Sequence, residues 1–279
     1  MERFYIITNE GKDHNLTVTK TIQHFILANG RSCEISSLNE QGHLLRNHIP
    51  QDIDCALVIG GDGTLIRAAR ELAHKEVPLL GINRGTLGYL TEVDVHDFQS
   101  ALKKVFNGEY QIEERMMIEG QVSNNGGATH TALNDIVVAR DGYQRIVYYD
   151  LFVNEVLLNS YSADGIIVST PTGSTGYNLS AGGPIVQPTA NVIVVTPICA
   201  HALNSSSVVL SPEDTITIRI KADRFGQTGH GAVSFDGAEL LPLSTGDSVS
   251  ICMSAEKTKI LKINQESFMN TIRNKMKSS

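Results

Sequence analysis

Residues 55–72 read CALVIGGDGTLIRAAREL. The first five residues form a short apolar run, which predicts a buried strand. After the glycine turn, Leu65 and Leu72 belong to an apolar face at helical spacing, which predicts a helix over residues 64–75. A strand, a glycine turn and a helix in succession are typical of a parallel α/β sheet, so this stretch sets the expected fold of the first part of the chain.

The flanking sequence repeats the same pattern. Residues 4–7 and 78–82 are apolar runs that predict two more strands. Residues 18–26 place apolar side chains on one helical face, and Asn29-Gly30 supplies a stop signal. Residues 94–106 predict a further helix. This alternation predicts a parallel sheet covered on both faces.

From about Tyr110 the pattern changes to short segments rich in β-branched residues, separated by turn residues. Such segments predict an all-β sandwich or pair of sheets. The expected strands are residues 135–140, 146–153, 192–196, 215–220, 249–252 and 259–263.

The last stretch, residues 265–277, is amphipathic and predicts a helix that must dock on another element. The expected fold class is therefore α/β plus all-β, with the last helix returning to the first domain. The expected parts are an α/β phosphate-binding domain (1–108), an all-β domain (109–263) and a C-terminal helix (264–279).

Composition narrows the possible partners and location. A formal net charge of −7 argues against a nucleic-acid partner, and no apolar run approaches the roughly 18–20 residues that span a bilayer. The first residues enter a strand pattern without a signal-peptide pattern. The 4 cysteines are scattered, which argues against zinc and structural disulfides. A cytoplasmic location is expected.

The loop at residues 60–64, GGDGT, predicts a phosphate site at the carboxyl end of a strand. Its glycines allow backbone N–H groups to approach a phosphate, and Thr64 is predicted to cap the following helix, whose N-terminus favours anions. The loop is neither a P-loop nor a G-x-G-x-x-G fingerprint, because Ile66 stands where the third glycine would be.

Asp62 is unusual in such a loop, because a carboxylate repels phosphate. It makes chemical sense if Asp62 takes a proton from an attacking hydroxyl or holds a bridging metal ion. The alternative is a tight turn in which Asp62 only bonds to the backbone.

Three further segments carry recognisable patterns: NRGTLGYLT (83–91), ALNDI (132–136) and ADGIIVSTPTGSTGYNLSAGGP (163–184). An asparagine amide can read an adenine edge, and a carboxylate can accept hydrogen bonds from ribose hydroxyls. Together with residues 60–64, these segments resemble the bacterial-type, ATP- or polyphosphate-dependent NAD kinase family. The GGDGT loop alone is shared with diacylglycerol and sphingosine lipid kinases. The sequence departs from the family at Gly176, where alanine is usual.

The resemblance implies an NAD kinase that phosphorylates the 2′-hydroxyl of the adenosine ribose of NAD with ATP, giving NADP and ADP. Asp62 is the implied proton acceptor, and Mg²⁺ accompanies ATP. The implied assembly is a homodimer or homotetramer. Within one chain, residues 1–108 are expected to bind phosphate and the all-β domain (109–263) to bind NAD, so the active site is expected in the cleft between these two domains.

The resemblance also implies the residues that bind the substrates. Arg67 is equally well explained as a solvated helix charge, and Ser162 replaces the arginine or lysine of many relatives. The expected set is Gly60, Gly61, Gly63, Thr64, Arg67, Asn134, Asp135, Arg145, Ser162, Asp164, Thr175, Gly176, Tyr177, Asn178, Leu179 and Ser180.

Two alternatives remain at this point. The first is a lipid or polyol kinase with the same loop, which would show an exposed apolar surface. The second is a regulator that binds NAD(P) without catalysis, against which the intact Asp62 argues. A serine hydrolase is excluded, because Ser174 does not lie in a G-x-S-x-G nucleophile elbow.

Overall fold

The computed structural model describes residues 1–39, 42–85, 88–142, 146–201, 206–223, 225–238, 240–264 and 268–277. The chain forms two compact units, the first made of Met1–Arg115 with Glu256–Ser279 and the second of Met116–Ala255. The domain boundaries expected after residues 108 and 263 stay a prediction. Within the described ranges, no helix is long and apolar enough to cross a membrane.

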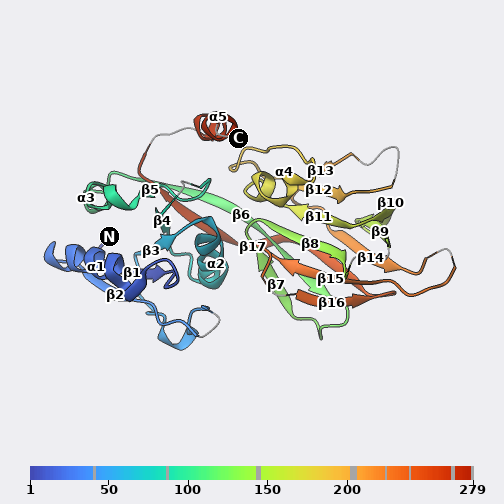
Figure 1. The fold of residues 1–279 in the computed structure, drawn as a ribbon, viewed down its shortest axis with the longest axis horizontal. Coiled ribbons are helices and arrows are strands. Elements are labelled where there is room, and N and C mark those ends of the chain that lie inside the picture. The colour runs from blue at the N-terminus through green and yellow to red at the C-terminus, as the bar shows by residue number, and fades with distance from the viewer. Residues whose placement is uncertain are drawn as a thin grey trace. The chain divides into compact units, whose positions relative to one another are not determined.

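The first unit is built on a parallel sheet in the order β2-β1-β3-β4-β5, and the last residues of β17 also pair in parallel with β4 (Figure 1). Its strands are β1 (Arg3–Thr8), β2 (Ser32–Ile35), β3 (Cys55–Gly60), β4 (Leu79–Asn83), β5 (Val93–Asp94) and the end of β17 (Ser248–Lys262). Its helices are η1 (His14–Leu16), α1 (Thr17–Ala28), η2 (Arg46–His48), α2 (Asp62–Leu72), η3 (Ala73–Lys75), η4 (Val95–Asp97), α3 (Phe98–Phe106) and α5 (Phe268–Lys277).

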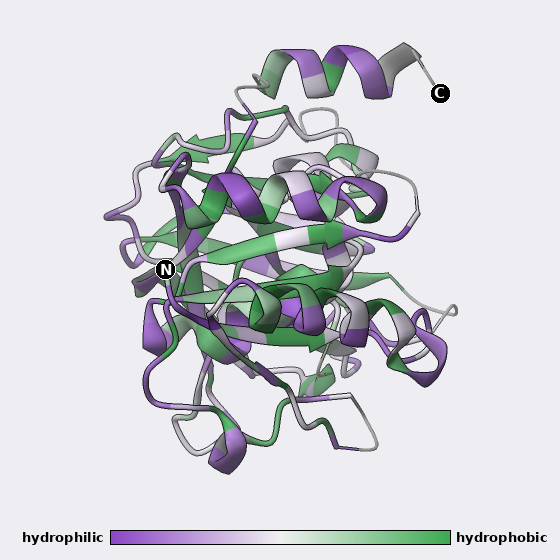
Figure 2. Cartoon of the chain, turned by 90° about the vertical axis from the view of Figure 1, so that its left-hand side faces the viewer, coloured by the Kyte–Doolittle hydropathy of each residue, from purple (hydrophilic) through white to green (hydrophobic). Residues whose placement is uncertain are grey.

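Successive strand residues point to opposite sides of this sheet, so its apolar strands present apolar side chains on both faces, and helices cover both. On one face, Ile6 and Leu57 share a buried cluster with Ile22 of α1 and Leu102 of α3. On the other face, Gly81 has no side chain, and Leu65 of α2 fills the space that its Cβ would take. Figure 2 shows apolar strands beneath helices of mixed hydropathy, as expected for amphipathic helices on a buried sheet.

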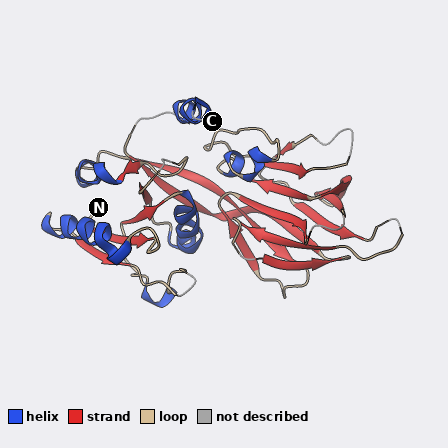
Figure 3. Cartoon of the chain, viewed as in Figure 1, coloured by secondary structure: helices blue, strands red, loops and turns tan. Residues whose placement is uncertain are grey.

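The second unit consists mainly of strands (Figure 3). One antiparallel sheet has the order β13-β12-β11-β8-β15-β16, and the other has the order β10-β9-β14-β17, with β6 paired to β17 and β7. The strands are β6 (Gln111–Val122), β7 (Thr129–Ala132), β8 (Asp135–Arg140), β9 (Val147–Val153), β10 (Val156–Ala163), β11 (Gly165–Ser169), β12 (Ile193–Ile198), β13 (Val208–Leu210), β14 (Ile216–Lys221), β15 (His230–Phe235) and β16 (Leu240–Ser244), with η5 (Gly173–Thr175) and α4 (Tyr177–Ser180) between β11 and β12.

Side chains from both sheets share one core in this unit. Ile136 of β8 and Val168 of β11 belong to the same buried cluster as Tyr149 of β9 and Ile218 of β14. The predicted fold class, an α/β unit with parallel strands followed by an antiparallel β unit, is confirmed.

The prediction for the last strands of the β region was wrong. Residues 249–252 and 259–263 were expected to be separate strands, but β17 runs without a break from Ser248 to Lys262. The polar residues between the two apolar segments suggest a turn. They are in fact compatible with a strand because they find partners there: the Ser254 hydroxyl donates to a Glu119 carboxylate oxygen of β6 at 2.7 Å.

Candidate active site

The glycine loop lies where β3 ends and α2 begins. The helix starts at Asp62, with Gly61 as its N-cap and no side-chain cap. The expected capping by Thr64 is therefore wrong, because Thr64 lies inside the first turn and its hydroxyl packs against Gly60, 2.5 Å from where a Cβ would be. The N–H groups of Asp62 and Gly63 have no acceptor among the described residues, as the first turn of a helix predicts.

The Asp62 carboxylate is held by the chain that follows β4. Its Oδ2 accepts the N–H of Tyr89 at 2.7 Å, and its Oδ1 accepts the N–H groups of Leu90 at 3.2 Å and Thr91 at 3.1 Å. A carboxylate has about four acceptor sites. Oδ2, with one described donor, keeps room to accept a further hydrogen bond from a ligand.

Gly88 explains why the second glycine segment accompanies the first. A Cβ on Gly88 would overlap the Asp62 carboxyl group, so only glycine leaves room for that carboxylate. The Gly88 N–H also donates to the Thr91 hydroxyl at 3.1 Å. The segments 60–64 and 88–91 therefore form one structure, with the carboxylate of the first enclosed by the backbone of the second.

We expect Gly88→Ala to lower the turnover number about 10–100-fold, because the new methyl group must displace the Asp62 carboxylate and small misplacements of reacting groups are costly. Steady-state kinetics with thermal unfolding as a fold check would measure this. Gly85→Ala is the matched control, since a Cβ on Gly85 meets no atom of the described residues within 4 Å. Equal activity of the two variants would contradict the close fit at Gly88.

In the second unit, Asn134 and Asp135 lie at the start of β8 and are anchored by Asp236. The Asp236 carboxylate accepts the N–H groups of Leu133 at 2.8 Å, Asn134 at 2.7 Å and Asp135 at 3.1 Å. Asp236 adopts φ 53° and is followed by Gly237 at φ 65°, a left-handed turn that brings its carboxylate back to the β8 backbone. Asp236 thereby fixes the backbone of the Asn-Asp pair.

Asp135 is only 6% exposed. Burial, and then the neighbouring charge of Asp236, raise the pKa of Asp135 to about 7. Two polar atoms of this region, Asn134 Oδ1 and Thr172 Oγ1, are buried without a hydrogen-bond partner in the described part of the chain. Buried polar atoms are normally paired, so these unpaired oxygens mark a place for a ligand's polar groups.

The segment after β11 packs directly on this pair. Gly173 lies so close that a Cβ would overlap the Asn134 backbone, and the Thr170 hydroxyl donates to the Leu133 carbonyl at 2.6 Å. A Cβ on Gly176 would lie 3.7 Å from Asn134 Nδ2 and 4.0 Å from an Asp135 carboxylate oxygen. The replacement of the usual alanine therefore leaves extra space beside both polar side chains.

Other expected residues differ in their surroundings. Asn178 is fully buried, donates to the Ser174 and Pro184 carbonyls, and accepts the Thr196 hydroxyl at 2.7 Å, so its amide supports the loop. Tyr177, Leu179 and Ser180 are exposed, whereas Thr175 and Ser162 are partly buried.

The expected charged residues lie in three different settings. Asp164 forms an ion pair with Arg140 at 3.0 Å. The guanidinium of Arg67 lies against Gly42, 2.8 Å from where a Cβ would be. Arg145 lies outside the described residues.

Sequence reasoning missed Asp236, Thr172 and the role of Gly88. The signal for Asp236 was present, because Asp236-Gly237 is a turn dipeptide directly after an apolar strand. Only the fold reveals that this turn meets the Asn-Asp pair, 101 positions away in the sequence.

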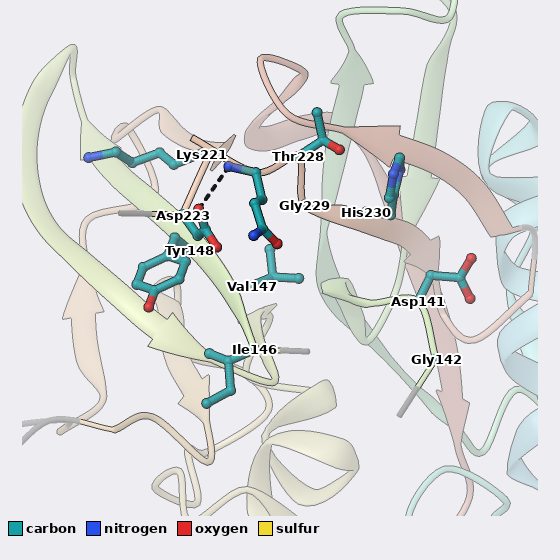
Figure 4. Close-up of a pocket in the computed structure, with 11 residues that line it drawn as sticks. Asp141, Gly142, Ile146, Val147, Tyr148, Lys221, Asp223, Thr228, Gly229 and His230 are labelled. Atoms are coloured by element: carbon teal, nitrogen blue, oxygen red, sulfur yellow. Dashed lines mark hydrogen bonds between the residues drawn. The ribbon is translucent and has the colours of Figure 1, made fainter. Parts of the chain in front are cut away.

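A separate cavity of about 640 Å³ lies in the second unit. Figure 4 shows Lys221, His230, Asp141 and Asp223 among its lining side chains, a set with both signs of charge. The Asp223 carboxylate is already engaged, since it accepts the Gln227 N–H at 2.8 Å. None of the described residues that the sequence predicted for substrate binding lines this cavity.

Among the described residues, no group of three or more His, Cys, Asp or Glu side chains could hold a metal ion. Mg²⁺ commonly keeps several waters and is held by substrate phosphates with one or two carboxylates, so it needs no such group.

Comparison with known proteins places these units in a class. The family model of the ATP-NAD kinase N-terminal domain matches residues 16–110, and that of the ATP-NAD kinase C-terminal domain matches residues 133–263. The NAD kinase of Lachnoclostridium phytofermentans is 41% identical over 99% of both chains. That of Agathobacter rectalis is 42% identical over the same shares. The chain belongs to the NAD kinase family.

Solved structures agree with this fold. An NAD kinase from Archaeoglobus fulgidus in complex with ATP is 25% identical, with a TM-score of 0.77 over 99% of both chains. Yeast NADH kinase complexed with NADH is 21% identical, with a TM-score of 0.88 over 99% of this chain and 88% of the yeast chain. The likeness to the yeast structure concerns the fold alone.

Proposed function

We propose that this chain is an NAD kinase that transfers a phosphate group from ATP to NAD, giving NADP and ADP. The observation that carries the proposal is the Asp62 carboxylate, held at the start of α2 by three backbone N–H groups and beside two helix N–H groups that have no acceptor among the described residues. A fixed carboxylate at an anion-binding helix terminus suits a reaction between a phosphate and a hydroxyl. Family membership over the whole chain supports the same activity.

In this proposal the acceptor is the 2′-hydroxyl of the adenosine ribose. Asp62 Oδ2 takes the hydroxyl proton while the oxygen attacks the terminal phosphorus of ATP and ADP leaves. The N–H groups of Asp62 and Gly63 bind phosphate oxygens, with Gly60, Gly61 and Thr64 shaping the loop. Mg²⁺ bound with ATP would neutralise phosphate charge. The protein's own contribution is to align donor and acceptor.

The nucleoside part of NAD is assigned to the second unit. Asn134 and Asp135 supply the polar contacts, and Thr172 joins them because its buried hydroxyl has no partner in the described residues. Tyr177, with an exposed ring, offers an aromatic surface for a base. Asp236 acts as a positioning residue through the β8 backbone.

The decisive experiment incubates the purified protein with ATP, Mg²⁺ and NAD, and identifies the products by mass. NADP and ADP in equal amounts are expected. A parallel reaction replaces NAD by diacylglycerol or sphingosine. Lipid phosphorylation without NADP would indicate the lipid kinase alternative, and NAD binding without any product would indicate a regulator.

The edge of one sheet supports the proposal of a homodimer or homotetramer. Strand β10 pairs with β9 on one side, and Val156, Leu157 and Leu158 are 70%, 51% and 45% exposed. Exposed apolar edge strands usually find a partner or are protected. The 4 free cysteines are consistent with a cytoplasmic location.

Leu157→Lys is expected to shift the protein toward monomers, because it places a charge on this edge. Size-exclusion chromatography with light scattering would measure the mass. Leu27→Lys, at a 49% exposed position on helix α1 and away from any sheet edge, is the matched control and should leave the mass unchanged. A monomeric wild-type protein would contradict the proposal.

A further inference from the structure

Lys12 lies over the glycine loop. Its Nζ is 3.8 Å from the position that a Cβ on Gly61 would take. Gly61 is the N-cap of α2, so the ammonium group is beside the N–H groups that the proposed function assigns to phosphate. No motif or periodicity selects Lys12, which lies in an exposed loop about 50 positions before Gly61.

The backbone around Lys12 is fixed to the same end of the sheet. The Asn9 N–H donates to the Ile59 carbonyl at 3.1 Å, one residue before the glycine loop. The Lys12 N–H donates to the Asn9 carbonyl at 2.9 Å, and the Lys12 carbonyl accepts a hydrogen bond from the Arg84 guanidinium. Lys12 is thus attached to the strand that carries the loop, and to the segment that follows β4.

Asp13 anchors the next position. Its carboxylate is buried, accepts the Thr19 hydroxyl at 2.7 Å and the Thr19 N–H at 2.9 Å, and pairs with Arg84 at 3.2 Å. Burial works to raise the pKa of Asp13, but these hydrogen bonds and the Arg84 charge outweigh it and lower that pKa. A charged Asp13 at neutral pH keeps this anchor intact.

The Lys12 ammonium has no hydrogen bond or ion pair within the described ranges. The Asp62 carboxylate accepts the backbone N–H groups of residues 89–91, and in the described ranges no hydrogen bond or ion pair joins it to Lys12. Arg67, the cation that the sequence suggested for this loop, lies against Gly42 instead. Among the residues that the structure describes, Lys12 is therefore a cation held at the loop with no protein anion paired to it.

We propose that Lys12 binds the phosphates of ATP at the loop Gly60–Thr64, and that Asp13 and Arg84 position it. The inference rests on the proposed function, because it assumes that ATP is the phosphate donor. An ammonium group can donate to phosphate oxygens that the helix N–H groups leave free, and charge-assisted hydrogen bonds of this kind are strong. An ordinary solvated lysine at this exposed position would contribute nothing to ATP affinity.

The test compares wild-type protein with Lys12→Gln, Lys12→Arg and Lys20→Gln, varying ATP at saturating NAD. Lys12→Gln should raise the KM for ATP about tenfold or more, with a smaller change in the KM for NAD. Lys12→Arg should restore most of the affinity because it keeps the charge. Lys20→Gln removes an exposed charge from α1 and should match the wild type.

Measuring ligand binding directly distinguishes a contact between Lys12 and phosphate from a general effect of the substitution on the structure. In titration calorimetry, Lys12→Gln should bind inorganic triphosphate more weakly than the wild type does, with unchanged affinity for adenosine. Its unfolding temperature should equal that of the wild type. Unchanged triphosphate binding and unchanged KM for ATP would overturn the inference while leaving the proposed function intact. A wild-type protein that forms no NADP would instead overturn the proposed function.

Discussion

Replacing Asp62 by asparagine is expected to lower the turnover number about 10²–10⁴-fold while NAD binding remains measurable. Asparagine keeps the size of the side chain and leaves the space beside Gly88 filled, but it cannot accept a proton at neutral pH. Single-turnover kinetics, with NAD binding measured by calorimetry, would separate the chemical step from substrate binding.

A structural effect must be separated from the loss of a base, because Asp62 also holds the backbone of residues 89–91. Thr91→Val is the matched control: it removes the hydroxyl that accepts the Gly88 N–H, and so loosens the same segment while keeping the carboxylate. If both variants lose turnover equally, Asp62 acts as a structural anchor and the assignment as a base is wrong.

Asp135→Asn is expected to stabilise the protein above pH 7 while weakening its affinity for NAD. Burial raises the pKa of Asp135 from 3.8 to about 7, so between these values the folded protein holds a proton that the unfolded chain releases. Stability therefore falls as the pH rises through this window, and the full penalty is present above pH 7. Removing it should raise the free energy of unfolding by about 2–4 kcal/mol at pH 8.

Urea denaturation at pH 4 and pH 8 would measure this, and the gain should vanish at pH 4. Asp141→Asn is the matched control, since it removes the same charge from an exposed position in the same unit. In the wild type, the KM for NAD should rise as the pH falls through about 7, because a protonated Asp135 is a weaker acceptor; this dependence should be absent in Asp135→Asn. If Asp135→Asn is no more stable than the wild type at pH 8, burial of the Asp135 charge does not destabilise the folded protein, and the prediction is wrong.

Sequence patterns located most strands and helices of the first unit, because a fully buried strand and an amphipathic helix each have a clear period. Strand β2 was missed, since it is only four residues long and alternates polar and apolar side chains. In the second unit many short strands were missed for a related reason. A strand such as β10 carries Asn159 and Ser160 between apolar residues, and its partners decide its structure more than its own composition does.

The same limit applies to the candidate site. Asp62, Asn134 and Asp135 stood out because their residue types are chemically suggestive within a recognisable motif. Asp236 and Lys12 did not, because each gains its significance from a distant segment that the fold brings near. Periodicity and motifs depend on residues that are close in the sequence, so they do not reveal contacts between segments that are far apart in it.

The fit between Asp62 and Gly88 also constrains how this sequence can change. Position 88 cannot vary alone, since any side chain there would displace the Asp62 carboxylate. In a library that varies residue 88 by itself, glycine should therefore dominate the functional clones. Varying both positions together should yield further pairs that fold well. A pair that lacks the aspartate should fold but show almost no turnover. The side chain that residue 88 can carry therefore depends on the side chain at residue 62.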